Sequence, residues 1–177
     1  MQVIADTNNN CLRKVMLPSR QVVTIAGGRG TGKAGWADGA GDTAALFGLP
    51  TGVAVDRDGT IYVADSNNHA IRKVSPDLVV STLSGSPEEA HRKPYWRDGS
   101  AKAARFNTPR DIALCSDRTL VVSDANNQCL RRVRVEDGHV TTIAGAPEQA
   151  GCVSSHTSRD AFYCGDVSPS ASSLRMS

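Results

Sequence analysis

The stretch TIYVADSNNHAIRKV, residues Thr60–Val74, has the pattern of two short β-strands joined by a polar turn. β-Branched and aromatic residues stand on both sides of an Asp-x-Asn-Asn sequence, which is typical of a hairpin. The pattern also occurs at Met1–Val15 (MQVIADTNNNCLRKV) and at Thr119–Val133 (TLVVSDANNQCLRRV). The turn aspartates Asp6, Asp65 and Asp124 are 59 residues apart (65 − 6 and 124 − 65). A constant period without gaps indicates a repeat protein.

Each complete copy predicts a four-stranded antiparallel meander, and the fold class is therefore all-β. In the middle copy, Asp58-Gly59 supplies the first hairpin turn. Its expected strands are Gly52–Asp56, Ile61–Ala64, Ala70–Val74 and Leu78–Leu83. Those of the third copy are Asp111–Cys115, Leu120–Ser123, Cys129–Val133 and Val140–Ala144. The first copy has three expected strands, at Gln2–Ala5, Cys11–Val15 and Gln21–Gly27, because the counterpart of Gly52–Asp56 is missing.

The two loops that lead into the complete copies share a second pattern. Trp36-Ala37-Asp38-Gly39 corresponds to Trp96-Arg97-Asp98-Gly99, and an alanine-rich segment then leads to Phe47 or Phe106. The interval from aspartate to phenylalanine is nine residues in one loop (47 − 38) and eight in the other (106 − 98). Such drift is typical of loops on a fixed scaffold. We expect the segments 42–47 and 101–106 to form single helical turns that place the phenylalanines in a core between units.

Length and composition limit the classes of protein. The 177 residues are expected to form one domain, and 20 Lys and Arg against 18 Asp and Glu argue against a general binder of nucleic acid or anionic membranes. No apolar run approaches the roughly 20 residues needed to cross a bilayer, and no signal peptide is visible. The compartment is left open, with the cytoplasm as the default. The serine-rich segment 146–177 is expected to be disordered.

No cofactor and no metal site are predicted. Cys11 and Cys129 occupy equivalent positions where the middle copy has Ala70, which favours small buried residues over a disulfide or metal ligands. The spacings of the five cysteines match no zinc pattern. The loop Gly27–Lys33 is close to a phosphate-binding pattern, but Ala34 stands where a hydroxyl side chain is required. Nucleotide binding is therefore not expected.

The aspartate and asparagine of each turn recur in all three copies. Catalysis needs one asymmetric set of groups, so a carboxylate repeated at every turn is predicted to be structural. We expect each aspartate to accept backbone N–H bonds from the asparagines that follow, with the later asparagine in the left-handed conformation. The predicted turn residues are Asp6, Asn9, Asp65, Asn68, Asp124 and Asn127.

The basic pairs Arg13-Lys14, Arg72-Lys73 and Arg131-Arg132 also recur. They can form a basic stripe for a ligand, or each can pair with a carboxylate of a neighbouring unit and pack its stem on apolar surface. Adjacent residues of a strand point to opposite faces, so at most one of each pair lines a given surface.

The pattern F-x-x-P-x-G-V-A-V-D-x-x-G-x-I-Y-V-A-D-x-x-N-H-x-I-R-K-V, at Phe47–Val74, resembles the NHL repeat, which builds β-propellers. The resemblance covers residues 1–145. The third copy departs from it at Asp111, Cys115 and Arg118, which replace Gly52, Asp56 and Gly59.

The resemblance implies a partial blade at 1–27 and blades at 52–85 and 111–145, an open arc of under three blades. Propellers close with about four to eight blades. The chain is therefore expected to be a fragment or truncated form of a larger ring, or to self-associate through its open faces.

The resemblance also implies a non-catalytic scaffold that binds a protein or another macromolecule through its loop face. Aromatic residues beside Arg and Lys are typical of binding hot spots. The candidate binding residues are Trp36, Arg29, Lys33, Arg92, Lys93, Tyr95 and Trp96 on the long loops, with Arg13, Arg72 and Arg131 from the basic pairs. In an alternative interpretation, the tryptophans only pin the loops to the scaffold.

Two other functions occur among similar propellers. The first is a metal-dependent lyase or lactonase with ligands on the innermost strands, where this sequence offers Asp56 and Asp111 at non-equivalent positions. The second is RNA binding by a basic face, which would rest on the Arg and Lys pairs. A protein partner is the leading expectation, RNA is the alternative partner, and no membrane span is predicted.

Overall fold

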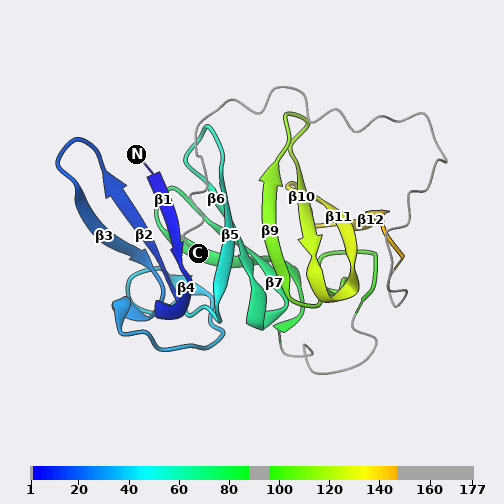
Figure 1. Ribbon diagram of the computed structural model, residues 1–177, viewed down its shortest axis with the longest axis horizontal. Coiled ribbons are helices and arrows are strands. Elements are labelled where there is room, and N and C mark those ends of the chain that lie inside the picture. Colours follow the sequence, from blue (N-terminus) through cyan, green and yellow to red (C-terminus); the bar gives the residue numbers. More distant parts are fainter. Residues whose placement is uncertain (1, 88–95, 147–177) are drawn as a thin grey trace.

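Three antiparallel sheets lie side by side in the protein (Figure 1). The computed structural model describes residues 2–87 and 96–146, except the side chain of Arg29. The predicted disorder of the serine-rich segment falls outside these residues and stays a prediction. Each sheet comes from one copy of the 59-residue repeat, so the sequence period is also the structural period.

Apart from the short β4, the strands follow chain order within each sheet. The first sheet consists of β1 (Gln2–Asp6), β2 (Cys11–Met16) and β3 (Gln21–Ala26). The second consists of β5 (Pro50–Val55), β6 (Ile61–Asp65), β7 (Ala70–Val74) and β8 (Val79–Gly85), with the short β4 (Gly39–Ala40) beside β8. The third consists of β9 (Pro109–Leu114), β10 (Thr119–Asp124), β11 (Cys129–Arg134) and β12 (Val140–Ala144). The predicted all-β fold of propeller blades in an open arc is confirmed.

The repeated turn differs in detail from the prediction. A three-residue 3₁₀ helix joins the two strands in each unit: η1 (Thr7–Asn9), η3 (Ser66–Asn68) and η5 (Ala125–Asn127). The left-handed residue is the one that follows, namely Asn10, His69 or Gln128. Its backbone N–H closes the turn, as in the 3.1 Å bond from Asn10 N to the Thr7 carbonyl. The expected left-handed asparagine was therefore wrong by one residue, because the 3₁₀ turn keeps Asn9, Asn68 and Asn127 inside the helix.

Each long loop ends in a single helical turn that buries a phenylalanine. Backbone bonds of 2.9 Å run from Ala44 N to the Ala40 carbonyl and from Ala104 N to the Ser100 carbonyl. The turns begin slightly earlier than predicted. Phe47 is fully buried and Phe106 is 3% exposed, which confirms the expected core positions.

Two hydrophobic clusters lie between the sheets, one on each face of the middle unit. Val63 and Val80 belong to the cluster with Phe47 and the first unit. Tyr62 and Ile71 belong to the cluster with the third unit. Alternate residues of a strand point to opposite faces, so the middle sheet is covered on both sides. Each outer unit has one face in these clusters.

A close approach joins the innermost strands β5 and β9. A Cβ atom added at Gly52 would lie 2.7 Å from the Cα of Asp111 and 2.9 Å from the backbone nitrogen of Ile112. Non-bonded carbon atoms pack at about 3.5–4.0 Å, so glycine is needed here for steric reasons. The third unit has Asp111 at the position equivalent to Gly52.

Candidate functional site

The most densely bonded polar group of the middle unit is the guanidinium of Arg72. Its Nη1 lies 2.7 Å from Oδ2 of Asp65, and both side chains are fully buried. Nη2 lies 2.7 Å from Oδ1 of Asp38 and donates to the Ala37 carbonyl at 2.8 Å. The Phe47 ring stands below the guanidinium, 5.3 Å from Cζ to centroid. Arg72 therefore fastens the loop before the blade to the sheet by charge, hydrogen bonds and an aromatic face.

Asp65 is satisfied by three different donors. Besides Arg72, its carboxylate accepts from the backbone N–H of Gly48 at 2.7 Å and from Nδ2 of Asn68 at 2.8 Å. Burial raises the pKa of Asp65, while Arg72, Asn68 and Gly48 act in the opposite direction. The asparagine of the motif binds the aspartate through its side chain, in place of the backbone contact expected from the sequence.

The third unit repeats this arrangement. Arg131 Nη1 lies 2.6 Å from Asp124 and Nη2 lies 2.8 Å from Asp98, with the Phe106 ring at 5.0 Å. Asn127 again donates to the aspartate at 2.8 Å. We call each set of arginine, turn aspartate, loop aspartate and loop phenylalanine a clasp. It closes the loop over one face of its own blade.

The clasps settle the role of two candidate binding arginines. Arg72 and Arg131 are fully buried, so they form no surface stripe, and that interpretation is wrong for both. The alternative prediction was that each arginine pairs with a carboxylate of a neighbouring unit. Each arginine does pair with carboxylates, but these belong to its own unit and its linker loop. Register explains this: Val63 pairs with Arg72 and Asp65 with Ala70, so Asp65 and Arg72 are diagonal neighbours on one face.

The first unit has only half of a clasp. Arg13 Nε lies 3.1 Å from Asp6, and the two side chains are 28% and 29% exposed. Arg13 Nη1 donates to Oγ1 of Thr24 at 2.6 Å, and Asn9 donates to Asp6. Among residues 2–87 and 96–146, no second carboxylate and no aromatic ring contacts the Arg13 guanidinium.

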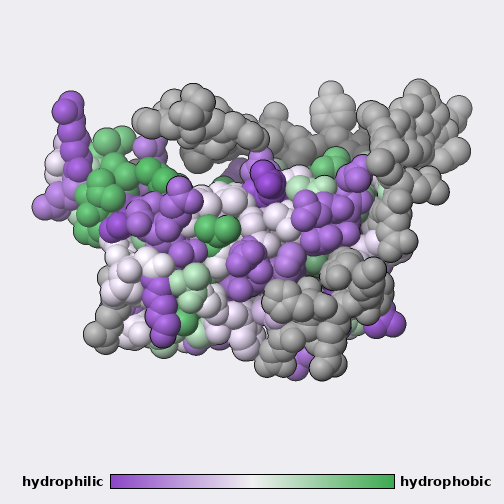
Figure 2. Space-filling model, turned by 60° about the horizontal axis from the view of Figure 1, so that its bottom comes forward, coloured by the Kyte–Doolittle hydropathy of each residue, from purple (hydrophilic) through white to green (hydrophobic). Residues whose placement is uncertain are grey.

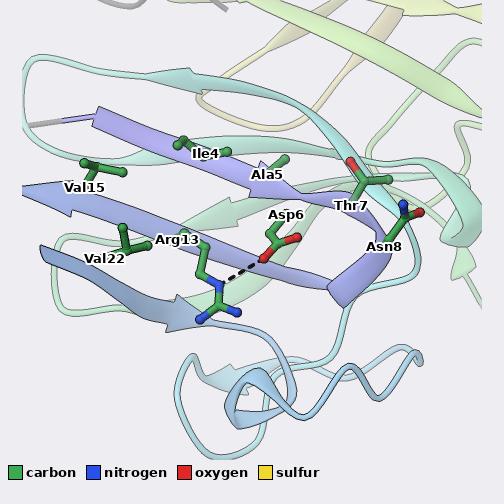
Figure 3. A pocket seen from close by; sticks show the side chains of 8 residues that line it. All are labelled: Ile4, Ala5, Asp6, Thr7, Asn8, Arg13, Val15 and Val22. Carbon is green, nitrogen blue, oxygen red and sulfur yellow. Dashed lines mark hydrogen bonds and ion pairs between the residues drawn. The ribbon is translucent and has the colours of Figure 1, made fainter. Parts of the chain in front are cut away.

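An open hollow of about 600 Å³ lies beside the half-clasp. Figure 3 shows the side chains that line it, among them Asp6 of β1 and Arg13 of β2, joined by their ion pair, and Ile4, Val15 and Val22 of β1, β2 and β3. The hollow therefore combines one guanidinium, one carboxylate and aliphatic side chains.

The structure describes only some of the candidate binding residues on the long loops. Trp36 is 39% exposed and Lys33 is exposed, whereas Trp96 is half-buried. The backbone of Arg29 lies in η2 (Gly28–Gly30). Arg92, Lys93 and Tyr95 fall outside the described residues. Binding by these loops therefore stays a prediction.

Sequence reasoning missed the loop aspartates as functional partners. Asp38 and Asp98 join the linker to the sheet, since each also accepts the backbone N–H of a threonine in the last strand, Thr82 at 3.1 Å and Thr142 at 2.9 Å. The signal was present: the W-x-D-G sequence and the phenylalanine occur before both copies whose arginine is buried.

The innermost strands offer no grouped metal ligands. Asp56 lies 3.6 Å from Arg118 Nη1, and Asp111 accepts the backbone N–H of Ile112. In residues 2–87 and 96–146, no three His, Cys, Asp or Glu side chains come together as a metal could require. Cys11 and Cys129 are buried free thiols, as predicted. None of the helices in the described ranges has the length and apolar character of a membrane span.

Three of the four residues of each clasp fall within recognised repeats, and the loop aspartates Asp38 and Asp98 precede them. The NHL repeat family matches residues 47–74 and 106–133, which run from the loop phenylalanine through the turn aspartate and the arginine. The Arabidopsis thaliana protein SUPPRESSOR OF QUENCHING 1, chloroplastic, is 32% identical over 146 residues, covering 79% of this chain and 13% of that protein. NHL repeat-containing protein 2 of Gallus gallus is 40% identical over 84 residues, covering 47% of this chain and 11% of that protein.

Solved structures show the same architecture. A structural genomics protein of unknown function from Bacteroides thetaiotaomicron superposes with a TM-score of 0.64 at 26% identity, covering 73% of this chain and 31% of that one. The chain thus spans less than a third of each of these three proteins. The chain therefore contains two NHL repeats, each within an antiparallel sheet of four or more strands, and a third, three-stranded sheet with the same hairpin pattern.

Proposed function

We propose that this NHL segment is a non-catalytic scaffold that binds a protein through its loop face. The observation that carries the proposal is that the first long loop is attached to the sheet next to an exposed tryptophan. Trp36 is 39% exposed, and two residues further Asp38 is held at 2.7 Å by the buried Arg72. An aromatic side chain on a fixed base loses little conformational freedom on binding, which favours affinity.

Lys33 adds a positive charge to the same loop. It is exposed and three residues from Trp36. Cations at the rim of an interface mainly raise the rate of association and select partners of opposite charge. An acidic protein surface with an apolar pocket therefore fits this loop.

The other two functions receive less support. A metal-dependent enzyme requires ligands gathered on the inner strands, and in the described residues Asp56 and Asp111 belong to no group of three possible ligands. Arg72 and Arg131 cannot contribute to a basic stripe that binds RNA, because both side chains are fully buried in the clasps. Phosphate contacts need accessible cations.

The test compares proteins captured by the wild-type chain with those captured by the double variant Trp36→Ala, Trp96→Ala. A control carries Leu78→Ala, an exposed residue of another turn. Proteins retained by the wild type and the control but lost from the folded double variant support the proposal. A purified candidate from that set should bind at least about tenfold more weakly to the double variant. Identical captured sets for all three proteins would contradict it.

A further inference from the structure

The outer face of the first sheet is apolar and uncovered. Ile4 is 46% exposed and Val22 is 56% exposed, whereas their counterparts in the middle unit, Val63 and Val80, are 0% and 1% exposed. Figure 2 shows an apolar patch at the end of the molecule that this sheet forms. Aliphatic side chains that are core residues in the other copies therefore face outward here.

The other two units show what covers this face. In the middle unit, Phe47 from the loop packs with Val63 and Val80 in one cluster. In the third unit, Phe106 does the same with Val122 and Val140. In both cases the linker, by which we mean the W-x-D-G…F loop preceding the blade, covers the face together with side chains of the preceding sheet. The chain therefore contains two internal templates for the missing contact.

The arginine on this face also has its counterparts in the other two units, where it binds the linker. Arg72 and Arg131 each use Nη2 to bind a linker carbonyl and a linker carboxylate. Arg13 uses Nε for Asp6 and Nη1 for Thr24. Within residues 2–87 and 96–146, its Nη2 has no hydrogen-bond partner. The guanidinium thus has a donor left for one more acceptor, and it borders the hollow (Figure 3).

We propose that this hollow is a binding site for the linker of a further NHL repeat. A carboxylate of that linker binds Nη2 of Arg13, and an aromatic residue eight or nine positions later packs over the guanidinium against Ile4 and Val22. The contacts complete the half-clasp. This surface is distinct from the loop face that carries Trp36.

A second folded copy of the chain is a poor occupant. Its own linkers are held by Arg72 and Arg131 through ion pairs of 2.7 and 2.8 Å, with the phenylalanines buried. To insert one of them, the second copy would have to open a clasp and expose a buried arginine. The occupant is therefore a linker that is not already closed on its own blade.

The test uses the chain's own linker as the probe. A labelled synthetic peptide with the sequence of residues 37–51, ADGAGDTAALFGLPT, is titrated into the full chain and followed by fluorescence anisotropy. Saturable binding is expected. Peptides with Asp38→Asn or Phe47→Ala should bind at least about tenfold more weakly, since each removes one of the two anchoring contacts.

Protein variants locate the site. Arg13→Gln should weaken peptide binding at least about tenfold, whereas Arg57→Gln, an equal charge change on an exposed hairpin, should not alter it. Val22→Asp provides a second variant should Arg13→Gln fail to fold by circular dichroism, and it too should weaken binding at least about tenfold. The peptide lacks Trp36, so failure here leaves the loop-face proposal standing.

Three outcomes would overturn the inference. The first is absence of saturable binding. The second is equal affinity for the wild-type and altered peptides, or for the wild-type chain and Arg13→Gln. The third is sedimentation of the chain as a dimer that Arg13→Gln dissociates, because the face would then belong to a second copy.

Discussion

The pairs Asp65–Arg72 and Asp6–Arg13 have the same residues, the same spacing and the same place in their hairpins, yet their surroundings differ. The first is fully buried with a contact of 2.7 Å, and the second is more than a quarter exposed with a contact of 3.1 Å. The hairpins are alike, so the difference comes from the linker, which covers only the former. The clasp is therefore a property of linker and hairpin together.

The largest expected effect compares the two aspartates directly. Asp65→Ala removes the carboxylate that neutralises the buried charge of Arg72, and it should lower the free energy of unfolding by about 3–5 kcal/mol. Asp6→Ala breaks a partly exposed pair and should cost about 0–1 kcal/mol. Urea unfolding of both variants measures the gap. Equal losses would show that the two pairs do not differ in energy as their burial indicates.

A matched pair of valines tests the apolar part of the comparison. Val80→Thr puts a hydroxyl into the cluster with Phe47, at a position 1% exposed, and should cost about 1–3 kcal/mol. Val22→Thr makes the same change at the equivalent position of the first unit, 56% exposed, and should stay within about 0.5 kcal/mol. Thermal unfolding of the two variants provides the measurement. A large loss at Val22 would mean that its face is covered.

Phe47→Leu sharpens the comparison by removing the ring while keeping most of the apolar volume. The guanidinium of Arg72 loses an aromatic face at 5.3 Å, and the expected loss of stability is about 1 kcal/mol. Phe106→Leu should behave alike, because Arg131 lies 5.0 Å from that ring. A loss in one variant but not in the other, measured by chemical denaturation, would show that the two clasps are not equivalent.

The smallest effect concerns acid. The Thr60 backbone and hydroxyl lower the pKa of Asp58 in the hairpin before β6, and Thr119 lowers that of Asp117 before β10. A lowered pKa adds stability above the unfolded value of about 3.9, and this is lost as the pH falls through the folded value. Asp58→Asn should therefore flatten stability against pH below about 4. An unchanged dependence of stability on pH below about 4 would contradict this. The first unit has no aspartate equivalent to Asp58, because its sequence lacks this hairpin.

Much of the fold could be predicted because it is local and repeated. The period of 59 residues, the Asp-Gly hairpin and the strand composition fix three meanders, and Phe47 and Phe106 are expected in a core because they recur. The recurring residues of the clasp are visible in the sequence, but which of them pair could not be predicted. Arg72 and Asp38 lie 34 residues apart across a loop of varying length, and either Arg72 or Lys73 could face inward. Only the register of β6 with β7 decides which one does.

The turn was misassigned for a related reason. Asparagine is the usual left-handed residue, so Asn68 was expected there, yet His69 adopts that conformation with φ of 51°. Its ring nitrogen Nδ1 accepts the backbone N–H of Thr108 in the next unit at 2.9 Å, as Asn10 accepts that of Leu49. The contact does not select the conformation, because Gln128 has φ of 54° without a corresponding side-chain contact in the described residues. The conformation follows from the 3₁₀ turn, which places the left-handed residue one position after the asparagine.

Gly52 determines how closely the inner strands of two successive blades can approach each other. Its missing side chain lets β9 come within contact distance of β5, but Asp111 presents a Cβ at the same position of the third unit. A blade added there by the same rotation would collide with that carbon. The inner strands at such a junction must stand wider apart, so the curvature of the row cannot be uniform along its length.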